Sequence, residues 1–414
     1  MTEATSATPA PDALAGVLAD APFVRLVATD DGDALAAAGL LARALRATGT
    51  PFQARVAADP VPADPDDGVA VTVGVDRGPH AIPGTGRPAS TAAFAVARAL
   101  GGDPDPVVAL AGVVAAGSIP GADGSGDALD AAERAGRVER RPGVALPVSG
   151  GAPGDQEAGA APSRAEALAA STLAATRYSG DPEAARDALA PLGLPADPDA
   201  DDRRRLASLV AVDAVDGDDA SERAASAVER ALRPYATDGP FETVGGYADV
   251  LDALAREAPG TGVALALASD PDDSLRKSAL DAWRRHGLAA HRALDAATVG
   301  RYDGCVVARV DASEAVLPTV ARLVRDFRSP EPVAVALDEG AGRLAVAATG
   351  GGHASGDAAG EPTDVGDACR TAAGEVGGDG WGTPERGGVS VATDANDAVD
   401  ADATAALAAL REAI

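Results

Sequence analysis

The chain of 414 residues is poor in the residue types that most often carry chemistry or recognition. It has a single lysine, Lys277, four histidines and two cysteines, and aromatic residues make up 3% of it. Cys305 and Cys369 stand far apart, which excludes a zinc motif and a disulfide framework and fits a reducing cytoplasm. The polar residues 1–11 do not predict a signal peptide, and no apolar run approaches the roughly 18 residues of a membrane span. We therefore expect a cytoplasmic protein with no membrane partner.

Basic residues are also scarce relative to acidic ones. Lys and Arg number 35 against 63 Asp and Glu, for a formal net charge of −28. Such an excess ordinarily argues against a nucleic-acid partner. The single lysine, the abundance of acidic residues along the chain and the reliance on Ala, Val and Leu are also typical of adaptation to molar salt, where the Debye length falls to about 3 Å. On this halophilic interpretation, which we favour, the net charge says little about partners.

Strand and helix patterns alternate from Phe23 onward, which predicts an α/β fold with a mostly parallel sheet and helices on its faces. After the first strand and helix, we expect strands at 69–75, 262–268, 304–310, 333–337, 343–348 and 389–391, and helices at 91–100, 107–116, 273–286 and 317–327. The stretch 149–162 has the composition of a linker, and helices follow it to 236. The sequence therefore predicts an N-terminal parallel-sheet domain (1–148), a linker and helical connector (149–238) and a smaller α/β domain (239–414).

Two aspartates follow the first predicted strand, in the sequence Thr29-Asp-Asp-Gly-Asp-Ala-Leu35. The D-x-D spacing places Asp31 and Asp33 on one side of the chain, at the strand end where α/β sheets bind ligands. Carboxylate oxygens suit a hard divalent cation. Acidic residues are also favoured electrostatically at a helix N-terminus, which explains the same pattern without a metal. Both interpretations stay open.

This stretch and the order of the elements after it resemble the DHH phosphoesterase superfamily, and within it the archaeal RecJ-like proteins. The first motif of that family, H-x-D-x-D-G-L, is similar to residues 29–35, with Thr29 in the place of the histidine. Residues 178–194 resemble an S-G-D-x-E-A-A…L-G-I segment of these proteins. Residues 247–257 resemble the start of their DHH-associated domain. The resemblance covers residues 23–395 and implies a DHH domain followed by a DHH-associated domain.

The resemblance also implies a manganese or magnesium site, of which few ligands remain. The residues that could hold a residual metal are Asp31, Asp33, Asp76 and His80. Nothing matches the D-H-H triplet, a lone loop histidine such as His80 is commonly solvated, and Ser118 stands where the fourth motif ends in an acid. A hydroxyl is a poorer ligand than imidazole for manganese, and two-metal phosphoryl transfer needs a fuller cage. We therefore predict a weak or absent metal site and assign no catalytic residue.

Two glycine-rich stretches are candidates for the G-G-G-H loop with which the DHH-associated domain contacts nucleic-acid phosphates. Gly351, Gly352 and His353 match its letters, with two extra residues inside the motif. The preceding helix and V-G-G-x-G run, and the strand that follows, instead place the motif at Gly380, Gly382 and Arg386, and we favour this alignment. Exposed N–H groups of either loop could receive a phosphate, although a flexible loop explains the first stretch as well.

Three arginines at helical spacing, Arg322, Arg325 and Arg328, are a further candidate for a nucleic-acid face. We include Arg325 among the candidate binding residues. The same spacing is typical of a solvated helix face, and this second interpretation stays open.

Three functions remain compatible with the sequence. We favour a catalytically degenerate RecJ-like protein that acts as a nucleic-acid-binding or replication and repair scaffold subunit. Its partners would be single-stranded DNA or RNA and replisome proteins such as GINS. The alternative is a manganese-dependent 5′-to-3′ single-strand-specific exonuclease or oligonucleotide phosphodiesterase. A third possibility is a protein that keeps only the fold and docks a partner without binding metal or nucleic acid.

Overall fold

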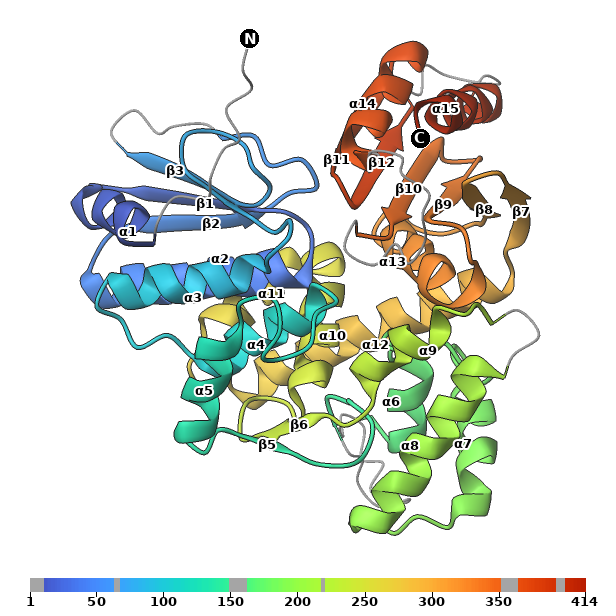
Figure 1. The fold of residues 1–414 in the computed structure, drawn as a ribbon, viewed down its shortest axis with the longest axis horizontal. Coiled ribbons are helices and arrows are strands. Elements are labelled where there is room, and N and C mark those ends of the chain that lie inside the picture. The colour runs from blue at the N-terminus through green and yellow to red at the C-terminus, as the bar shows by residue number, and fades with distance from the viewer. Residues whose placement is uncertain (1–10, 63–67, 149–161, 217–219, 351–363, 392–398) are drawn as a thin grey trace. The chain divides into compact units, whose positions relative to one another are not determined.

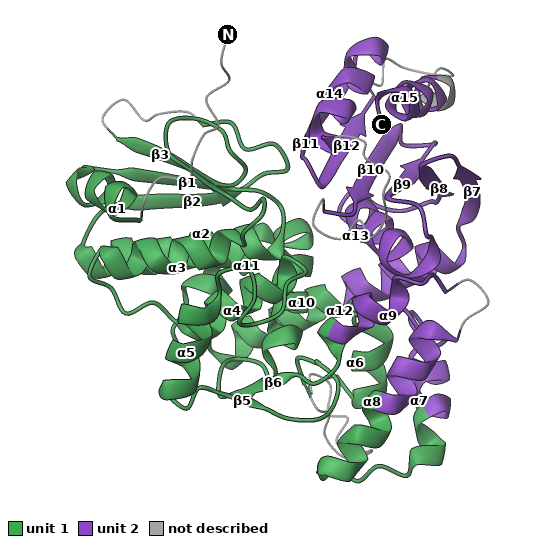
Figure 2. Ribbon diagram, in the orientation of Figure 1, with its two compact units in different colours: residues 1–173, 189–207, 230–284 green, residues 174–188, 208–229, 285–414 purple. Residues whose placement is uncertain are grey.

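The computed structural model describes residues 11–62, 68–148, 162–216, 220–350, 364–391 and 399–414. Figure 1 shows the order of the helices and strands along the chain. The chain divides into two compact units, which Figure 2 colours separately. Unit 1 contains residues 1–173, 189–207 and 230–284, and unit 2 contains residues 174–188, 208–229 and 285–414. Residues 239–284, which the sequence division assigns to the C-terminal domain, thus cluster with the N-terminal residues.

Unit 1 is built on the predicted parallel sheet. Its strand order is β2-β1-β3-β4, and every pair is parallel. The strands are β1 (Val24–Ala28), β2 (Phe52–Val56), β3 (Val69–Gly74) and β4 (Ala81–Pro83). The helices of the same region are α1 (Pro11–Asp20), α2 (Gly32–Thr48), α3 (Ala89–Ala99), α4 (Pro106–Ala115) and α5 (Gly126–Arg134). The expected helices at 91–100 and 107–116 are therefore confirmed, and β1 and β3 are almost wholly buried, as is usual for central parallel strands.

The strand expected at 262–268 is wrong, because these residues belong to helix α11 (Pro259–Leu267). A short apolar run cannot distinguish a buried strand from a buried helix. Here Pro259 occupies the first helical turn, and the absence of a side chain at Gly39 of α2 lets α11 approach closely. A Cβ at Gly39 would lie 2.5 Å from the Cβ of Ala266. Packing against α2 therefore decides the conformation.

Helices α10 (Val244–Glu257) and α12 (Asp273–Asp295) flank α11 in the sequence. The second extends the helix expected at 273–286 by nine residues. Between the linker and α10 the chain forms mostly helices, as expected for the connector. They are α6 (Arg164–Ala170), α7 (Pro182–Leu189), η1 (Ala190–Leu192), α8 (Ala200–Val215), α9 (Ala224–Val228), η2 (Glu229–Ala231) and β6 (Tyr235–Thr237). Strand β6 pairs antiparallel with β5 (Val138–Arg140).

Unit 2 contains a six-stranded sheet of order β11-β12-β10-β9-β8-β7. Its only parallel pair is β8 with β9. The strands are β7 (Thr298–Tyr302), β8 (Cys305–Arg309), β9 (Val333–Asp338), β10 (Arg343–Ala348), β11 (Asp379–Thr383) and β12 (Arg386–Ser390). The helices are α13 (Leu317–Leu323), which continues as a π-helical turn (η3, Val324–Arg328), α14 (Val365–Val376) and α15 (Val399–Ala413). The strands expected at 304–310, 333–337 and 343–348 are confirmed.

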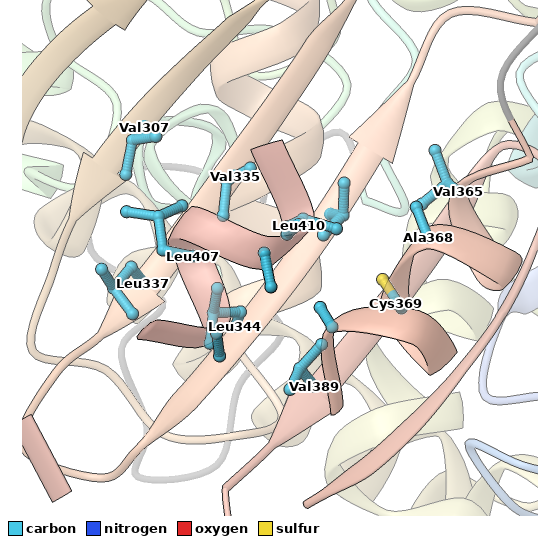
Figure 3. Packing of buried hydrophobic residues seen from close by; sticks show 14 of the residues in the cluster. Val307, Val335, Leu337, Leu344, Val365, Ala368, Cys369, Val389, Leu407 and Leu410 are labelled. Carbon is cyan, nitrogen blue, oxygen red and sulfur yellow. The ribbon is translucent and has the colours of Figure 1, made fainter. Parts of the chain in front are cut away.

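The core of unit 2 lies between its sheet and the helices α14 and α15. Figure 3 shows Val335, Leu337 and Leu344 of the sheet with Leu407 and Leu410 of α15. Alternate residues of β8, β9, β10 and β12 face this core, and α13 packs against β9 and β10. None of the helices in the described part of the chain is long and apolar enough to cross a membrane.

Candidate functional site

The N-terminus of α2 is where the sequence places the metal ligands, and Asp31 is its N-cap. Strand β1 ends at Ala28, and Asp31 adopts the extended backbone of a cap (φ −134°, ψ 161°). One carboxylate oxygen accepts the N–H of Ala34 at 2.8 Å, and the other accepts the hydroxyl of Thr29. Thr29 is itself buried. Thr29, which the resemblance aligns with a metal-binding histidine, therefore serves as a hydrogen-bond donor to the nearby Asp31.

Asp33 holds two helices together. Its side chain is buried, and its two oxygens accept the N–H groups of Ala89 at 2.6 Å and of Ser90 at 2.9 Å. Helix α3 begins after Pro88, which offers no side-chain cap, so the carboxyl group from α2 supplies one. Burial, followed by the charge of Asp31, raises the pKa of Asp33 to about 7. Asp33 thus works as a cap that is only partly ionised at neutral pH.

Two residues of α10, Asp252 and Arg256, reach the N-terminus of α2, and the sequence analysis missed both. Together with Thr29, Asp31 and Asp33 they form what we call the α2 corner. One oxygen of Asp252 accepts the N–H of Gly32 at 3.1 Å, and the other lies 2.8 Å from Nη1 of Arg256. The Arg256 side chain is only 7% exposed. Despite the opposing effect of burial, the charges of Asp252, Asp30 and Asp31 raise its pKa above the ordinary value. The i,i+4 spacing of Asp252 and Arg256, which makes the two residues neighbours when the segment is helical, was the available signal for an ion pair.

The other two predicted metal ligands lie in the loop between β3 and β4. Asp76 is exposed and His80 is half-buried. The carbonyl oxygen of His80 accepts the N–H of Thr72 at 3.0 Å, which fixes the backbone of this loop. Within the residues that the structure describes, no three His, Cys, Asp or Glu side chains form a group able to hold a metal ion. Asp31, Asp33, Asp76 and His80 are therefore not gathered into a common site.

The residues at the α2 N-terminus also do not fit a divalent metal by their chemistry. The oxygens of Asp31 and Asp33 face N–H and O–H donors, and a buried guanidinium supplies positive charge beside them. A cation placed here would compete with these donors and be repelled by Arg256.

Ser118, which the resemblance places where the fourth motif ends in an acid, donates its hydroxyl to Asp123 of its own loop.

The second candidate region is the β11–β12 hairpin, which holds the glycines chosen by context. A Cβ at Gly380 would lie 2.3 Å from the carbonyl oxygen of Cys369 in α14, and one at Gly382 would lie 2.4 Å from that of Arg386. Gly382 also has φ +152°, which favours glycine. The two glycines are thus required for close packing. Gly351, Gly352 and His353 lie outside the described residues.

Trp381, between these glycines, points to the opposite face of the hairpin because successive strand residues alternate. It pairs with Gly388 across the hairpin, and a Cβ on that glycine would lie 2.7 Å from the indole ring. Trp381 is half-buried, and Arg386 pairs with Thr383 two residues along. The indole ring of Trp381 therefore packs against Gly388, and Arg386 lies two residues along the same strand as Gly388.

The three arginines at helical spacing are all tied to groups of unit 2. Arg325 donates to Asp326 at 2.7 Å and to the carbonyl oxygen of Ala348 at 2.9 Å. Arg322 lies 3.9 Å from Asp326, and Arg328 lies 3.5 Å from Asp295. The bond of Arg325 to Ala348 and the pair of Arg328 with Asp295 hold η3 against other elements of unit 2. A further role of these arginines in binding has to be tested separately.

Sequence comparison decides the family. The family model described as the C-terminal domain of uncharacterized protein rrnAC1427 matches residues 297–412. Uncharacterized protein rrnAC1427 of Haloarcula marismortui is 45% identical over 389 residues, which cover 93% of each chain. This chain belongs to the rrnAC1427 family.

Among solved structures, this member of the rrnAC1427 family is similar to CDC45 from Entamoeba histolytica, with a TM-score of 0.56, 8% identity and 97% coverage of each chain. Exonuclease RecJ bound to manganese gives a TM-score of 0.49 at 13% identity, covering 99% of this chain and 96% of that one. RecJ from Thermus thermophilus in complex with Mn²⁺ gives 0.48 at 14% identity, covering 99% of this chain and 56% of that one. The chain thus spans about half the length of the Thermus protein. The likeness to CDC45 shows the fold, which is the α/β fold expected from the sequence.

Proposed function

We propose that this protein is a RecJ-like DHH-superfamily protein that has lost phosphoesterase catalysis and binds single-stranded nucleic acid as a replication or repair scaffold subunit. The observation that carries the proposal is the use of the retained aspartates. Asp31 caps α2 and accepts from Thr29, and Asp33 caps α3. The residues that would bind catalytic metal thus hold helices in place.

The electrostatics of the corner support the loss of catalysis. Two-metal phosphoryl transfer depends on ionised ligands that hold cations about 3.5–4 Å apart. The guanidinium of Arg256 adds a positive charge beside Asp31, which lowers the affinity of this place for a divalent cation. Manganese or magnesium would therefore bind weakly.

The β11–β12 hairpin supplies the surface that we propose for nucleic acid. Trp381 presents a partly exposed aromatic ring, and Arg386 follows on the neighbouring strand. Stacking of a base on an aromatic ring is worth about 1–3 kcal/mol and tolerates any sequence. Phosphate contacts weaken steeply as salt rises, because they depend on counterion release. In the salt-rich cytoplasm implied by the composition, stacking on Trp381 would therefore contribute more than the arginines.

A nuclease assay tests the loss of catalysis. The wild-type protein is incubated with 5′-labelled single-stranded DNA and RNA in molar KCl with Mn²⁺, beside an Asp31→Asn variant. We expect no products from either protein. Manganese-dependent products from the wild type that disappear in a folded Asp31→Asn variant would support the alternative, a manganese-dependent exonuclease or oligonucleotide phosphodiesterase.

A binding assay tests the hairpin surface. Trp283 is fully buried, so quenching of tryptophan fluorescence by an unlabelled single strand would report on Trp381. We expect Trp381→Ala to weaken binding about 5- to 100-fold, as loss of one stacked base predicts, and Trp381→Phe to weaken it less. Equal binding by Trp381→Ala and the wild type would move the nucleic-acid surface away from this hairpin.

The scaffold role is tested with a protein partner. The likeness to CDC45 in fold, together with the resemblance to archaeal RecJ-like proteins, motivates replisome proteins such as GINS as candidates. We expect this protein and purified GINS of a halophilic archaeon to elute together from a sizing column in molar KCl. Separate elution at concentrations of tens of micromolar would remove this partner from the proposal.

A further inference from the structure

A cleft of about 1100 Å³ lies within unit 2, at the carboxyl ends of the parallel strands β8 and β9. Its walls come from the C-terminal part of α12, the loop after β8 and the turn between β9 and β10. The carboxyl ends of parallel strands are where α/β sheets bind ligands, and the volume is sufficient for a small molecule. None of the lining residues was a candidate from the sequence.

Asp338, the last residue of β9, is a buried charge in the wall of this cleft. It is 8% exposed, and one carboxylate oxygen accepts the N–H of Ala341 at 3.0 Å. Among the described residues, the other oxygen has no hydrogen-bond partner and no cationic side chain pairs with Asp338. The adjacent Glu339 differs, because it pairs with Arg309 at 2.8 Å. A buried carboxylate without a counter-charge is unfavourable, so Asp338 can gain from a cationic ligand group.

Arg292 of α12 brings the opposite charge to the cleft without pairing to its carboxylates. Its Nε donates to the carbonyl oxygen of Gly180 at 3.1 Å, and its guanidinium forms no ion pair with any described carboxylate. The side chain of Asp311, after β8, likewise has no partner in the described part of the chain. The other lining residues of α12 are small and apolar, namely Ala289, Ala293 and Ala296. The cleft thus combines separated opposite charges with methyl groups.

We propose that this cleft binds a small zwitterionic molecule of the amino-acid or short-peptide type. The ammonium or guanidinium group of the ligand pairs with Asp338 and Asp311, and its carboxylate pairs with Arg292, since a guanidinium can hold a carboxylate through two parallel hydrogen bonds. A purely anionic ligand would meet two unpaired carboxylates, and a purely cationic one would leave Arg292 unused. Burial of Asp338 keeps the attraction effective in molar salt, because buried charges are screened less than exposed ones.

Isothermal titration calorimetry of the full chain in molar KCl tests this proposal. The probes are L-arginine, the dipeptide Ala-Arg, agmatine, which lacks the carboxylate of arginine, and AMP as an anion. We expect at least one of the two zwitterions to bind, and to bind about 10-fold more tightly than agmatine, as the loss of one charge-assisted interaction predicts. AMP should not bind to the cleft.

Two substitutions assign the two ends of the ligand. Asp338→Asn keeps a side-chain oxygen for the N–H of Ala341, and we expect it to weaken binding of every cationic probe about 10-fold or more. Arg292→Gln should weaken the zwitterions by a similar factor and leave agmatine within about twofold, a selectivity that a merely structural role would not produce. Asp303→Asn and Arg301→Gln, at exposed positions of the β7–β8 hairpin, are the matched controls and should bind like the wild type.

Thermal unfolding of each variant verifies that it is folded. If Asp338→Asn does not fold, Asp311→Asn at an exposed position takes its place, and it should weaken L-arginine and agmatine alike. Unchanged affinity in Asp338→Asn, or in its substitute, would overturn the proposal. So would the absence of binding by both zwitterions at about 20 mM, well above the range of an ordinary specific ligand, or binding by AMP alone. None of these outcomes bears on the nuclease and nucleic-acid assays, which test other residues.

Discussion

The α2 N-terminus and the β11–β12 hairpin, which the sequence singles out for metal and for nucleic acid, use their residues in opposite ways. At α2 the aspartates are turned inward, since Asp31 and Asp33 accept hydrogen bonds from the protein itself. At the hairpin the glycines, Gly380 and Gly382, fit against neighbouring backbone, and Trp381 between them is partly exposed.

This difference teaches that the type of a residue in a motif does not by itself decide its role. A carboxylate can serve as a metal ligand, a helix cap or one half of an ion pair, and its neighbours decide which. A glycine can expose an N–H group or allow close packing, and the distance to the nearest backbone decides that. Interpretation of a degenerate motif therefore depends on the groups that surround it.

The largest effect should come from breaking the ion pair at the α2 corner. Asp252→Ala leaves the buried guanidinium of Arg256 without its partner, and removing one member of a buried pair costs about 3–5 kcal/mol. Denaturant unfolding measures this loss. Asp273→Ala is the control, because Asp273 forms an exposed i,i+3 pair with Arg276, and we expect a change below about 0.5 kcal/mol there. A small effect of Asp252→Ala would mean that the corner is not held by charge.

The hairpin should respond to volume instead of charge. Gly380→Ala places a methyl group 2.3 Å from the carbonyl oxygen of Cys369, and overpacking of this kind costs about 1–3 kcal/mol. Gly374→Ala, in the last turn of α14 with open space around it, should instead stabilise by up to about 0.5–1 kcal/mol. If Gly380→Ala were neutral and weakened nucleic-acid binding, the glycine would be a binding residue and not a packing one.

The sequence predicted a parallel sheet with its central strands β1 and β3 in unit 1, and most of the strands of unit 2, because their β-branched runs and turn residues act locally. It did not predict the short outer strands β2 and β4. It failed at α11, where an apolar run of seven residues has no intrinsic preference strong enough to decide and Gly39 of another helix sets the outcome.

The candidate site was predicted only in part for a similar reason. Asp31 and Asp33 were placed correctly after the first strand, and the helix-end interpretation of them was already open. Their partners could not be foreseen, since Asp252 meets Gly32 across 220 residues and Ala89 meets Asp33 across 56. The spacing of Asp252 and Arg256 indicates that they are neighbours, but not which helix end they reach. Long-range partners of a motif come only from the fold.

A smaller effect is expected where a single hydrogen bond of the corner is removed. Thr29→Val keeps the shape of this buried side chain and deletes the hydroxyl that donates to Asp31. We expect a loss of about 1 kcal/mol in the free energy of unfolding, since Asp31 keeps the N–H of Ala34 and partial access to water. Thr48→Val, which removes an exposed hydroxyl bond within the same helix, is the control. A stabilised Thr29→Val protein would show that the hydroxyl is not part of the support of this corner.

The smallest effect should come from Arg325, which the sequence offered as a nucleic-acid ligand. Arg325→Ala removes its bonds to Asp326 and to the carbonyl oxygen of Ala348. Arg322 remains within 3.9 Å of Asp326, so this buried carboxylate keeps a positive neighbour, and we expect a loss of only about 0.5–1 kcal/mol. Affinity for single-stranded nucleic acid, measured by fluorescence anisotropy in molar KCl, should stay within about twofold of the wild type. Salt at that concentration screens the attraction between a single arginine and the phosphates. A loss as large as that of Trp381→Ala, at unchanged stability, would instead make Arg325 part of the binding surface and extend that surface from the hairpin to η3.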